Sequence, residues 1–227
     1  MRVLHSVSAV FDDPNLVSAA GLAPVLALAE RAGLHDLVAE HLTVPGSAGA
    51  NLVVKIPSLV AGMVAGADSI TDMDLLRHGG MGRLFTEVRA PTTLGTCLRG
   101  FTFGHVRQLD AIASRLLIAL AKRTPLLAGA DSVAYLDLDD TMRETHGYAK
   151  QGAGFGYSGV RGLNALLATV STAWSAPVIV AQRLRRGAVG QLPVDGVEGG
   201  RVDHLVRGHP VDDQLKDFDL PVVHHLG

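Results

Sequence analysis

The chain has 227 residues, of which 48% are hydrophobic and 19% charged, and this composition indicates a globular protein of one or two domains. Its net charge of −2 gives no global electrostatic argument for a nucleic-acid partner, although a local basic surface stays compatible with it. The single cysteine, Cys97, excludes an internal disulfide, and no long apolar signal segment precedes Asp12. We therefore expect a protein of the reducing cytoplasm.

Residues 1 to about 130 are predicted to be helical, because apolar residues recur there at helical spacing between glycine and proline breaks. We expect helices over residues 24–33, 34–42, 52–64, 69–80, 91–101 and 103–123. Thr71, with Asp74 three residues later, is typical of a helix start. The last helix has a predicted apolar stripe formed by Val106, Leu109, Ala113, Leu116, Leu117 and Leu120.

From residue 131 the pattern changes to strands, which we expect over residues 132–140, 163–173 and 176–184. Pro177 and the preceding "AWSA" indicate a turn between the last two strands. Short links between consecutive strands favour an antiparallel meander. The charge-free stretch 162–182 is long enough to cross a membrane, but its polar residues and proline favour two strands, so we expect no membrane partner.

Three aspartates, at 137, 139 and 140, lie at the end of the first predicted strand. Since alternate residues of a strand share a face, Asp137 and Asp139 should point the same way, opposite to Leu136 and Leu138. Neighbouring carboxylates repel each other unless a cation lies between them, and their hard oxygens suit Mg²⁺ or Mn²⁺. The alternative is a strand that runs into an acidic, solvated turn at Asp140.

The segment "DLDDT" at residues 137–141 resembles the first motif of haloacid-dehalogenase-type phosphohydrolases. That resemblance implies that Asp137 is a nucleophile and Asp139 an acid/base. The family has a helix after the motif and a parallel sheet, whereas this chain is predicted to continue with a glycine-rich loop and further strands. The resemblance covers five residues.

A longer resemblance involves "ADSITDMDLLRHGGMGRLF", "RAPTTLGTCLRGFTFGHVRQLDAIASRLL" and "YLDLDDT" with "HGYAKQGAGFGYSGVRGLNALLATVS". In this order the segments are similar to the DDE-type transposases of bacterial insertion sequences (DDE group 1), over roughly residues 15–187. The resemblance implies an α+β fold, in which a helical N-terminal region precedes the first antiparallel strands of an incomplete ribonuclease-H-like domain. The family's Asp–any–Thr pattern falls on Asp139–Thr141, which implies that Asp139 is the first catalytic and metal-binding aspartate, with Asp137 as the near alternative.

The same resemblance implies DNA transposition by two-metal phosphodiester cleavage and strand transfer, with Mg²⁺ or Mn²⁺ as cofactor and the element's terminal inverted repeats and target DNA as partners. The family needs three carboxylates, but nothing after Arg186 resembles it. We therefore expect a truncated or frameshifted transposase, inactive as it stands, with residues 1–130 engaging DNA, 131–187 starting the catalytic domain and 188–227 forming an atypical tail. The alternative is a tail that is a genuine variant.

Basic residues are candidates for contacts with DNA phosphates, and these are Arg77, Arg83, Arg99, Arg107, Lys150 and Arg161. The last two flank the glycine-rich loop beside the acidic strand, where backbone amides can approach a phosphate. For the helical arginines the alternative is a mixed solvated surface, and for the loop it is a plain hairpin connection. A third functional class is a non-catalytic DNA-binding regulator derived from a transposase, and a homodimer is compatible with all of these.

Overall fold

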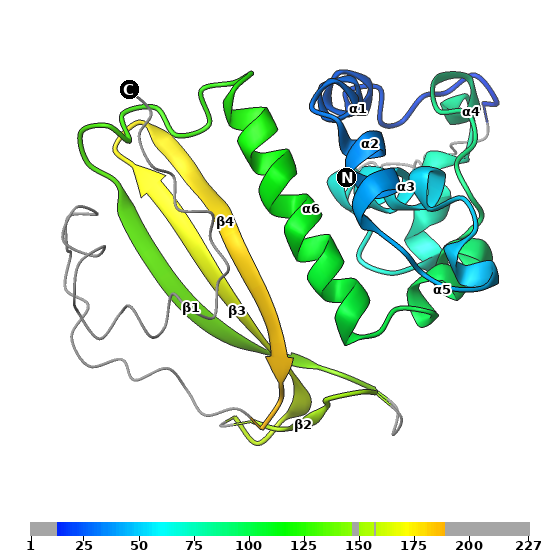
Figure 1. Cartoon of the computed structure of the whole chain (residues 1–227). Helices are drawn as coiled ribbons and strands as arrows, with labels where there is room; N and C mark the ends of the chain where they lie inside the picture. The colour runs from blue at the N-terminus through cyan, green and yellow to red at the C-terminus, as the bar shows by residue number, and fades with distance from the viewer. Residues whose placement is uncertain (1–12, 147–149, 157, 189–227) are drawn as a thin grey trace, which may run out of the picture. The chain divides into compact units, whose positions relative to one another are not determined.

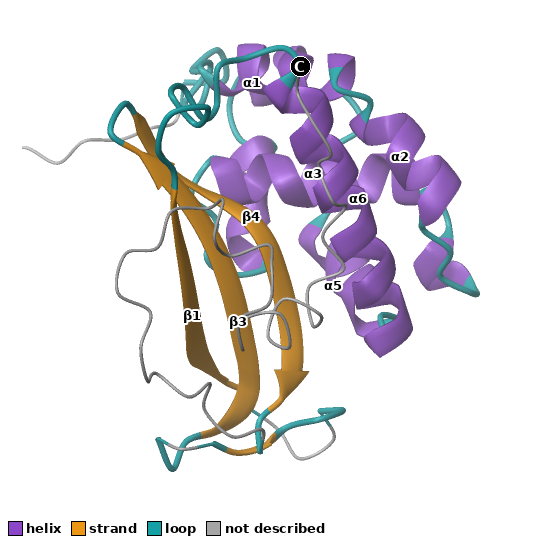
Figure 2. Cartoon of the chain, turned by 60° about the vertical axis from the view of Figure 1, so that its left-hand side comes forward, coloured by secondary structure: helices purple, strands orange, loops and turns teal. Residues whose placement is uncertain are grey.

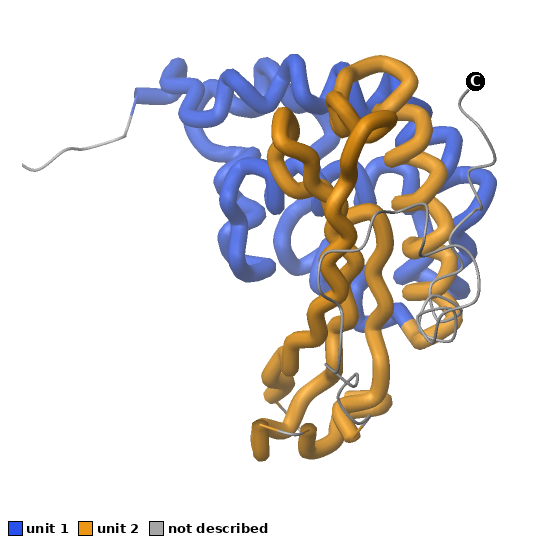
Figure 3. Tube along the Cα trace, turned by 90° about the vertical axis from the view of Figure 1, so that its left-hand side faces the viewer, with its two compact units in different colours: residues 1–101 blue, residues 102–227 orange. Residues whose placement is uncertain are grey.

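The computed structural model describes residues 13–146, 150–156 and 158–188. Its described part is α+β, with both helices and strands (Figure 2). The helices come before the strands along the chain, which confirms the predicted order. The chain divides into two compact units between Phe101 and Thr102 (Figure 3). The sequence instead predicts a boundary near residue 130, where the pattern changes from helices to strands. The two boundaries differ by helix α6 (Phe103–Ala121), which the structure groups with the strands because it contacts strand β4 (Ser175–Arg186).

The first unit is helical throughout its described part. Its elements are α1 (Leu22–Arg31), α2 (Leu34–His41), the 3₁₀ helix η1 (Ser47–Gly49), α3 (Leu52–Val64), the 3₁₀ helix η2 (Thr71–Leu76), α4 (Met81–Leu84) and α5 (Pro91–Arg99). Gly33 separates α1 from α2 with a φ of 89°, a left-handed conformation that favours glycine. Pro91 is at the first position of α5, where its missing N–H has no helical partner to lose.

Apolar side chains from most of these helices form the core of the first unit. Its fully buried side chains are Val38, Leu76, Met81, Leu94 and Cys97. One charged residue of α3, Lys55, is also only 5% exposed. Its ammonium donates hydrogen bonds to the carbonyl oxygens of Ser47 (3.2 Å) and Ala48 (3.0 Å), so the buried charge is compensated by η1.

The predicted helix start at Thr71 is wrong in its detail. Residues 71–76 form a 3₁₀ helix, and Thr71 makes no side-chain capping hydrogen bond. Instead Asp72 accepts hydrogen bonds from the backbone N–H and the hydroxyl of Ser69, both at 2.8 Å. These bonds lower the pKa of Asp72. The carboxylate of Asp72, the residue after Thr71, therefore stabilises this turn. Asp74 forms an ion pair with Arg77 and takes no part in capping.

The second unit contains an antiparallel sheet in which β3 (Arg161–Thr172) is the central strand (Figure 1). Strand β1 (Tyr135–Glu144) pairs with one side of β3, whereas β4 and the short β2 (Gly154–Phe155) pair with the other. The predicted antiparallel meander is confirmed. The charge-free stretch 162–182 forms β3, the following turn and most of β4, as expected. Among the described helices, none is long and apolar enough to span a bilayer.

Pro177 lies within β4 and not in the turn that the sequence predicts. The turn between β3 and β4 is shorter, because Thr172 pairs directly with Ser175. The Thr172 hydroxyl also donates a 2.6 Å hydrogen bond to the carbonyl oxygen of Ala128, which ties the turn to the segment before β1. Proline is tolerated in β4 because the pairing is irregular there and the strand has only β3 as a neighbour among the described residues.

One face of the sheet is the apolar core of the second unit. Leu166 and Ala168 of β3 are completely buried there, and the partly buried side chains that pack against them are Leu136, Leu138, Val180 and Ala181. Helix α6 runs alongside β4 (Figure 1). Its predicted stripe needs a correction: Ala113 is exposed, and Ile112, outside that stripe, is the buried residue of α6.

Candidate functional site

The acidic strand β1 alternates between an exposed and a half-buried face. Asp137 and Asp139 lie on the exposed face, opposite Thr169 and Leu167 of β3. Residues two apart in a strand are about 7 Å apart along the chain, so both carboxylates can approach one ion from the same side. Among the described residues, neither carboxylate has an ion-pair or hydrogen-bond partner. Their predicted placement on one face is confirmed, and their role as metal ligands stays a prediction.

Asp140 points to the opposite face and has a different environment. Its side chain is only 8% exposed, and it forms an ion pair with Arg185 of β4 (Nη2 to Oδ2, 3.1 Å). The side-chain amide of Asn164 donates a second hydrogen bond to the same carboxylate oxygen, at 3.2 Å. The alternative of a solvated turn at Asp140 is therefore wrong, since the strand continues to Glu144.

Asn164 of β3 is the centre of this polar network. It is completely buried, and its Oδ1 accepts hydrogen bonds from Arg185 Nε (2.9 Å) and Nη2 (2.7 Å). Asn164 lies directly opposite Arg185 in the sheet, so the network connects all three long strands. Sequence reasoning missed this network. The available signal was the position of Asp140, which shares a strand face with Leu136 and Leu138 and so needs a partner.

The two exposed carboxylates do not by themselves complete a metal site. Asp137 and Asp139 lie on one strand, and the described residues contain no group of three or more Asp, Glu, His or Cys side chains that could hold an ion. The phosphohydrolase interpretation predicts a helix directly after the motif. Instead, β1 extends to Glu144 and its neighbour β3 is antiparallel, so the local structure does not supply the helix that this interpretation requires.

The predicted DNA-contacting arginines of the first unit lie in different local environments. Arg83 is exposed at the end of α4. Arg77 forms an ion pair with Asp74 at 2.7 Å, and Arg99 donates a hydrogen bond to the Thr96 hydroxyl at 3.1 Å. All three side chains are accessible to a phosphate, and their role in DNA binding stays a prediction.

The glycine-rich loop lies at the far end of the β1–β3 ladder from the carboxylate pair. Lys150 is exposed, and Arg161 begins β3. Asp139 pairs with Leu167, six residues after Arg161, which corresponds to about 20 Å along the strand. The two basic residues therefore could contact the same DNA as the carboxylates, but not the same phosphate.

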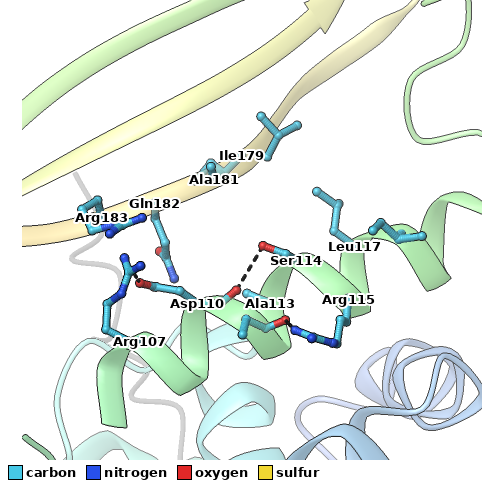
Figure 4. A pocket seen from close by; sticks show the side chains of 13 residues that line it. Arg107, Asp110, Ala113, Ser114, Arg115, Leu117, Ile179, Ala181, Gln182 and Arg183 are labelled. Carbon is cyan, nitrogen blue, oxygen red and sulfur yellow. Dashed lines mark hydrogen bonds and ion pairs between the residues drawn. The ribbon is translucent and has the colours of Figure 1, made fainter. Parts of the chain in front are cut away.

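A groove lies between α6 and β4 in the second unit, and we call it the α6–β4 groove (Figure 4). It has a volume of about 610 Å³ and is lined by side chains of α6 between Arg107 and Ile118 and of β4 from Ile179 to Arg183. Arg107, another predicted DNA contact, lies at its polar end beside Asp110, with 3.8 Å between Nη1 and Oδ2. Burial raises the pKa of Asp110 to about 6, and the nearby Arg107 guanidinium opposes this shift.

The predicted tail, residues 188–227, lies outside the described residues except for Ala188. The second unit thus offers three candidate functional features. They are the carboxylate pair on the exposed face of β1, the buried Asp140–Asn164–Arg185 network on the other face, and the α6–β4 groove. No protein-family model, no curated protein and no solved structure matches the chain.

Proposed function

We propose that the chain derives from a DDE-type transposase of an insertion sequence and that β1, β3 and β4 are the opening strands of a ribonuclease-H-like catalytic domain. The observation that carries this proposal is the pair Asp137 and Asp139, side by side and without partners among the described residues on the first strand of an antiparallel meander. That strand order is the one implied by the family resemblance.

The proposed chemistry is metal-dependent cleavage of a DNA phosphodiester. Asp139, assisted by Asp137, would hold Mg²⁺ or Mn²⁺, which supplies charge stabilisation and an activated oxygen nucleophile when bound. The protein's own contribution is to fix the direction of these carboxylates. Asp140 supports this role because its ion pair with Arg185 holds β1 against β3 and β4, so that the neighbouring Asp139 faces outward.

The chain as it stands is proposed to lack strand-cutting activity. Two-metal catalysis requires carboxylates from more than one strand or helix, and the described residues bring no third carboxylate, histidine or cysteine to Asp137 and Asp139. In the described sheet, β1 has β3 as its single neighbour, and its other edge could receive a further strand. DNA binding without cutting, by the basic residues named above, would then make the protein a regulator that competes at the element's ends.

Metal binding is the first test of this proposal. We expect the full chain to bind Mn²⁺ weakly, detected by electron paramagnetic resonance, and the double variant Asp137→Asn/Asp139→Asn to lose this binding. Asp131→Asn is a matched control, because Asp131 is an exposed carboxylate of the same unit outside the strand. Mn²⁺ binding that is unchanged in the double variant would refute the proposed site.

The second test uses DNA. The transposase origin predicts terminal inverted repeats on both sides of the gene, and the missing carboxylate segments in another reading frame after codon 187. We expect the protein to shift a duplex that carries those repeats in a gel, without nicking it in Mg²⁺. Cutting would overturn the proposed inactivity, whereas the absence of repeats and of any transposase-like continuation would overturn the origin itself.

A further inference from the structure

Three buried polar atoms meet at one end of the α6–β4 groove without hydrogen-bond partners in the described part of the chain. They are Arg107 Nη1, Asp110 Oδ2 and Arg183 Nε. The first two are 3.8 Å apart, which is too far for a hydrogen bond. All three residues line the groove, and Figure 4 shows the guanidinium of Arg183, from β4, on the same side as Arg107 and Asp110, from α6.

Unsatisfied buried donors are costly, so a group that supplies acceptors to both arginines would be bound favourably. The charges at this end are two guanidinium groups and one carboxylate. Arg115 also lines the groove from α6, and its Nη1 donates to the Ala111 carbonyl oxygen at 3.1 Å. Even without Arg115, the two guanidinium groups outnumber the one carboxylate at this end, so its described groups carry a net positive charge. Guanidinium groups match the planar oxygen pairs of phosphate and sulfate.

We propose that the α6–β4 groove binds an oxyanion, namely the phosphate group of a nucleotide or of a nucleic-acid backbone, between Arg107 and Arg183. Its volume of about 610 Å³ is sufficient for a nucleotide-sized group. Toward its other end the groove has apolar lining, where Leu117 of α6 points toward the strand that carries Ile179, and it can accept a sugar or base there (Figure 4). Only the nucleic-acid source of the phosphate rests on the proposed transposase origin.

Asp110 makes the binding dependent on pH. Its carboxylate faces Arg107 on its own helix, and Gln182 and Arg183 of β4 line the groove opposite. Ser114 donates a hydrogen bond to the backbone carbonyl oxygen of Asp110 at 3.1 Å, so it does not satisfy the carboxylate. As an anion it opposes a bound phosphate, whereas in the protonated form it can donate a hydrogen bond to one of the phosphate oxygens. Binding should therefore take up a proton and strengthen as the pH falls through the pKa of Asp110, which is about 6.

Sulfate is the first probe, because it keeps its charge throughout this pH range whereas phosphate does not. We expect the full chain to bind sulfate in an NMR or calorimetric titration, and to bind it at least about tenfold more tightly at low pH than at neutral pH. Asp110→Asn should remove that pH dependence. Arg183→Gln should weaken binding at least about tenfold, and Arg107→Gln serves as the second variant if Arg183→Gln does not fold.

Arg186→Gln is the matched control, since Arg186 is exposed on the same strand outside the groove, and it should bind sulfate as the wild type does. The proposal would be overturned if the folded wild type showed no saturable binding of sulfate. It would also be overturned if Arg183→Gln and Arg186→Gln bound sulfate equally well. A titration with thymidine monophosphate and one with duplex DNA then distinguish the sources. Sulfate and nucleotide binding without DNA binding would support oxyanion binding by the groove and refute its transposase-derived role. DNA binding that is unaffected by Arg183→Gln and by sulfate would leave the transposase origin standing and refute phosphate binding by the groove as the basis of DNA binding.

Discussion

Replacing Arg185 by methionine should destabilise the second unit strongly. The substitution keeps much of the side-chain volume but removes the guanidinium from Asp140 and Asn164. Of its partners among the described residues, the Asp140 carboxylate, 8% exposed, would keep only the Asn164 amide, at 3.2 Å. Removing one member of a buried ion pair costs about 3–5 kcal/mol, compared with about 0–1 kcal/mol for a surface pair. Since Arg185 is itself 12% exposed, we expect a loss of about 3 kcal/mol.

The loss should be measured as the free energy of unfolding in urea, followed by the circular dichroism of the strands. Asp140→Asn removes the charge that Arg185 compensates, so the double variant Asp140→Asn/Arg185→Met should be more stable than the sum of the single losses predicts, by about 2 kcal/mol. Arg186→Met, at an exposed position of the same strand, should change stability by less than about 0.5 kcal/mol. A similarly small effect of Arg185→Met would show that water already solvates the network and would refute the reasoning.

Three further predictions concern single groups in the two units. The raised pKa of Asp110 means that the folded protein binds a proton more tightly than the unfolded chain, so stability should fall by at most about 3 kcal/mol as pH rises from about 4 to about 6, and urea titrations of Asp110→Asn should lack this fall. Burial raises the pKa of the Cys97 thiol, against the nearby Lys55 charge, so a thiol reagent should label Cys97 only after unfolding; rapid labelling of the native protein would contradict this. In Gly162→Ala the new methyl group would meet the backbone carbonyl of Arg143, so we expect a loss of about 1–3 kcal/mol in thermal unfolding, whereas in Gly104→Ala the methyl group would make only an ordinary van der Waals contact with Thr102 Oγ1, at 3.9 Å, and should be tolerated.

The sheet could be predicted from the sequence because its pattern is local. Alternation of apolar and polar residues fixes which residues of β1 share a face, and short links fix the antiparallel order. The placement of Asp137 and Asp139 on one face follows from this alternation alone. The errors lie at the ends of elements, as in the position of Pro177, because a local pattern does not fix how many residues the turn takes.

The Asp140–Asn164–Arg185 network could not be predicted because it depends on the register between strands. Asp140 and Arg185 are separated by 45 residues, and their contact requires both the β1–β3 and the β3–β4 pairing to be correct. A shift of one residue in either pairing would reverse the side chains of a whole strand. For the same reason the α6–β4 groove, whose arginines come from different elements, had no signature in the sequence beyond the single candidate Arg107.

The alternation of β1 assigns different roles to three neighbouring acids. Asp140 is compensated by a buried arginine and an asparagine, as expected for a group that holds strands in register. Asp137 and Asp139 have no compensating cation among the described residues, although side chains on one face of a strand lie close enough to repel each other. Aspartate is also unfavourable in strands. The pair is unfavourable on both counts, and this is the physical reason for proposing a cation on the exposed face of β1 and not at the more deeply buried Asp140.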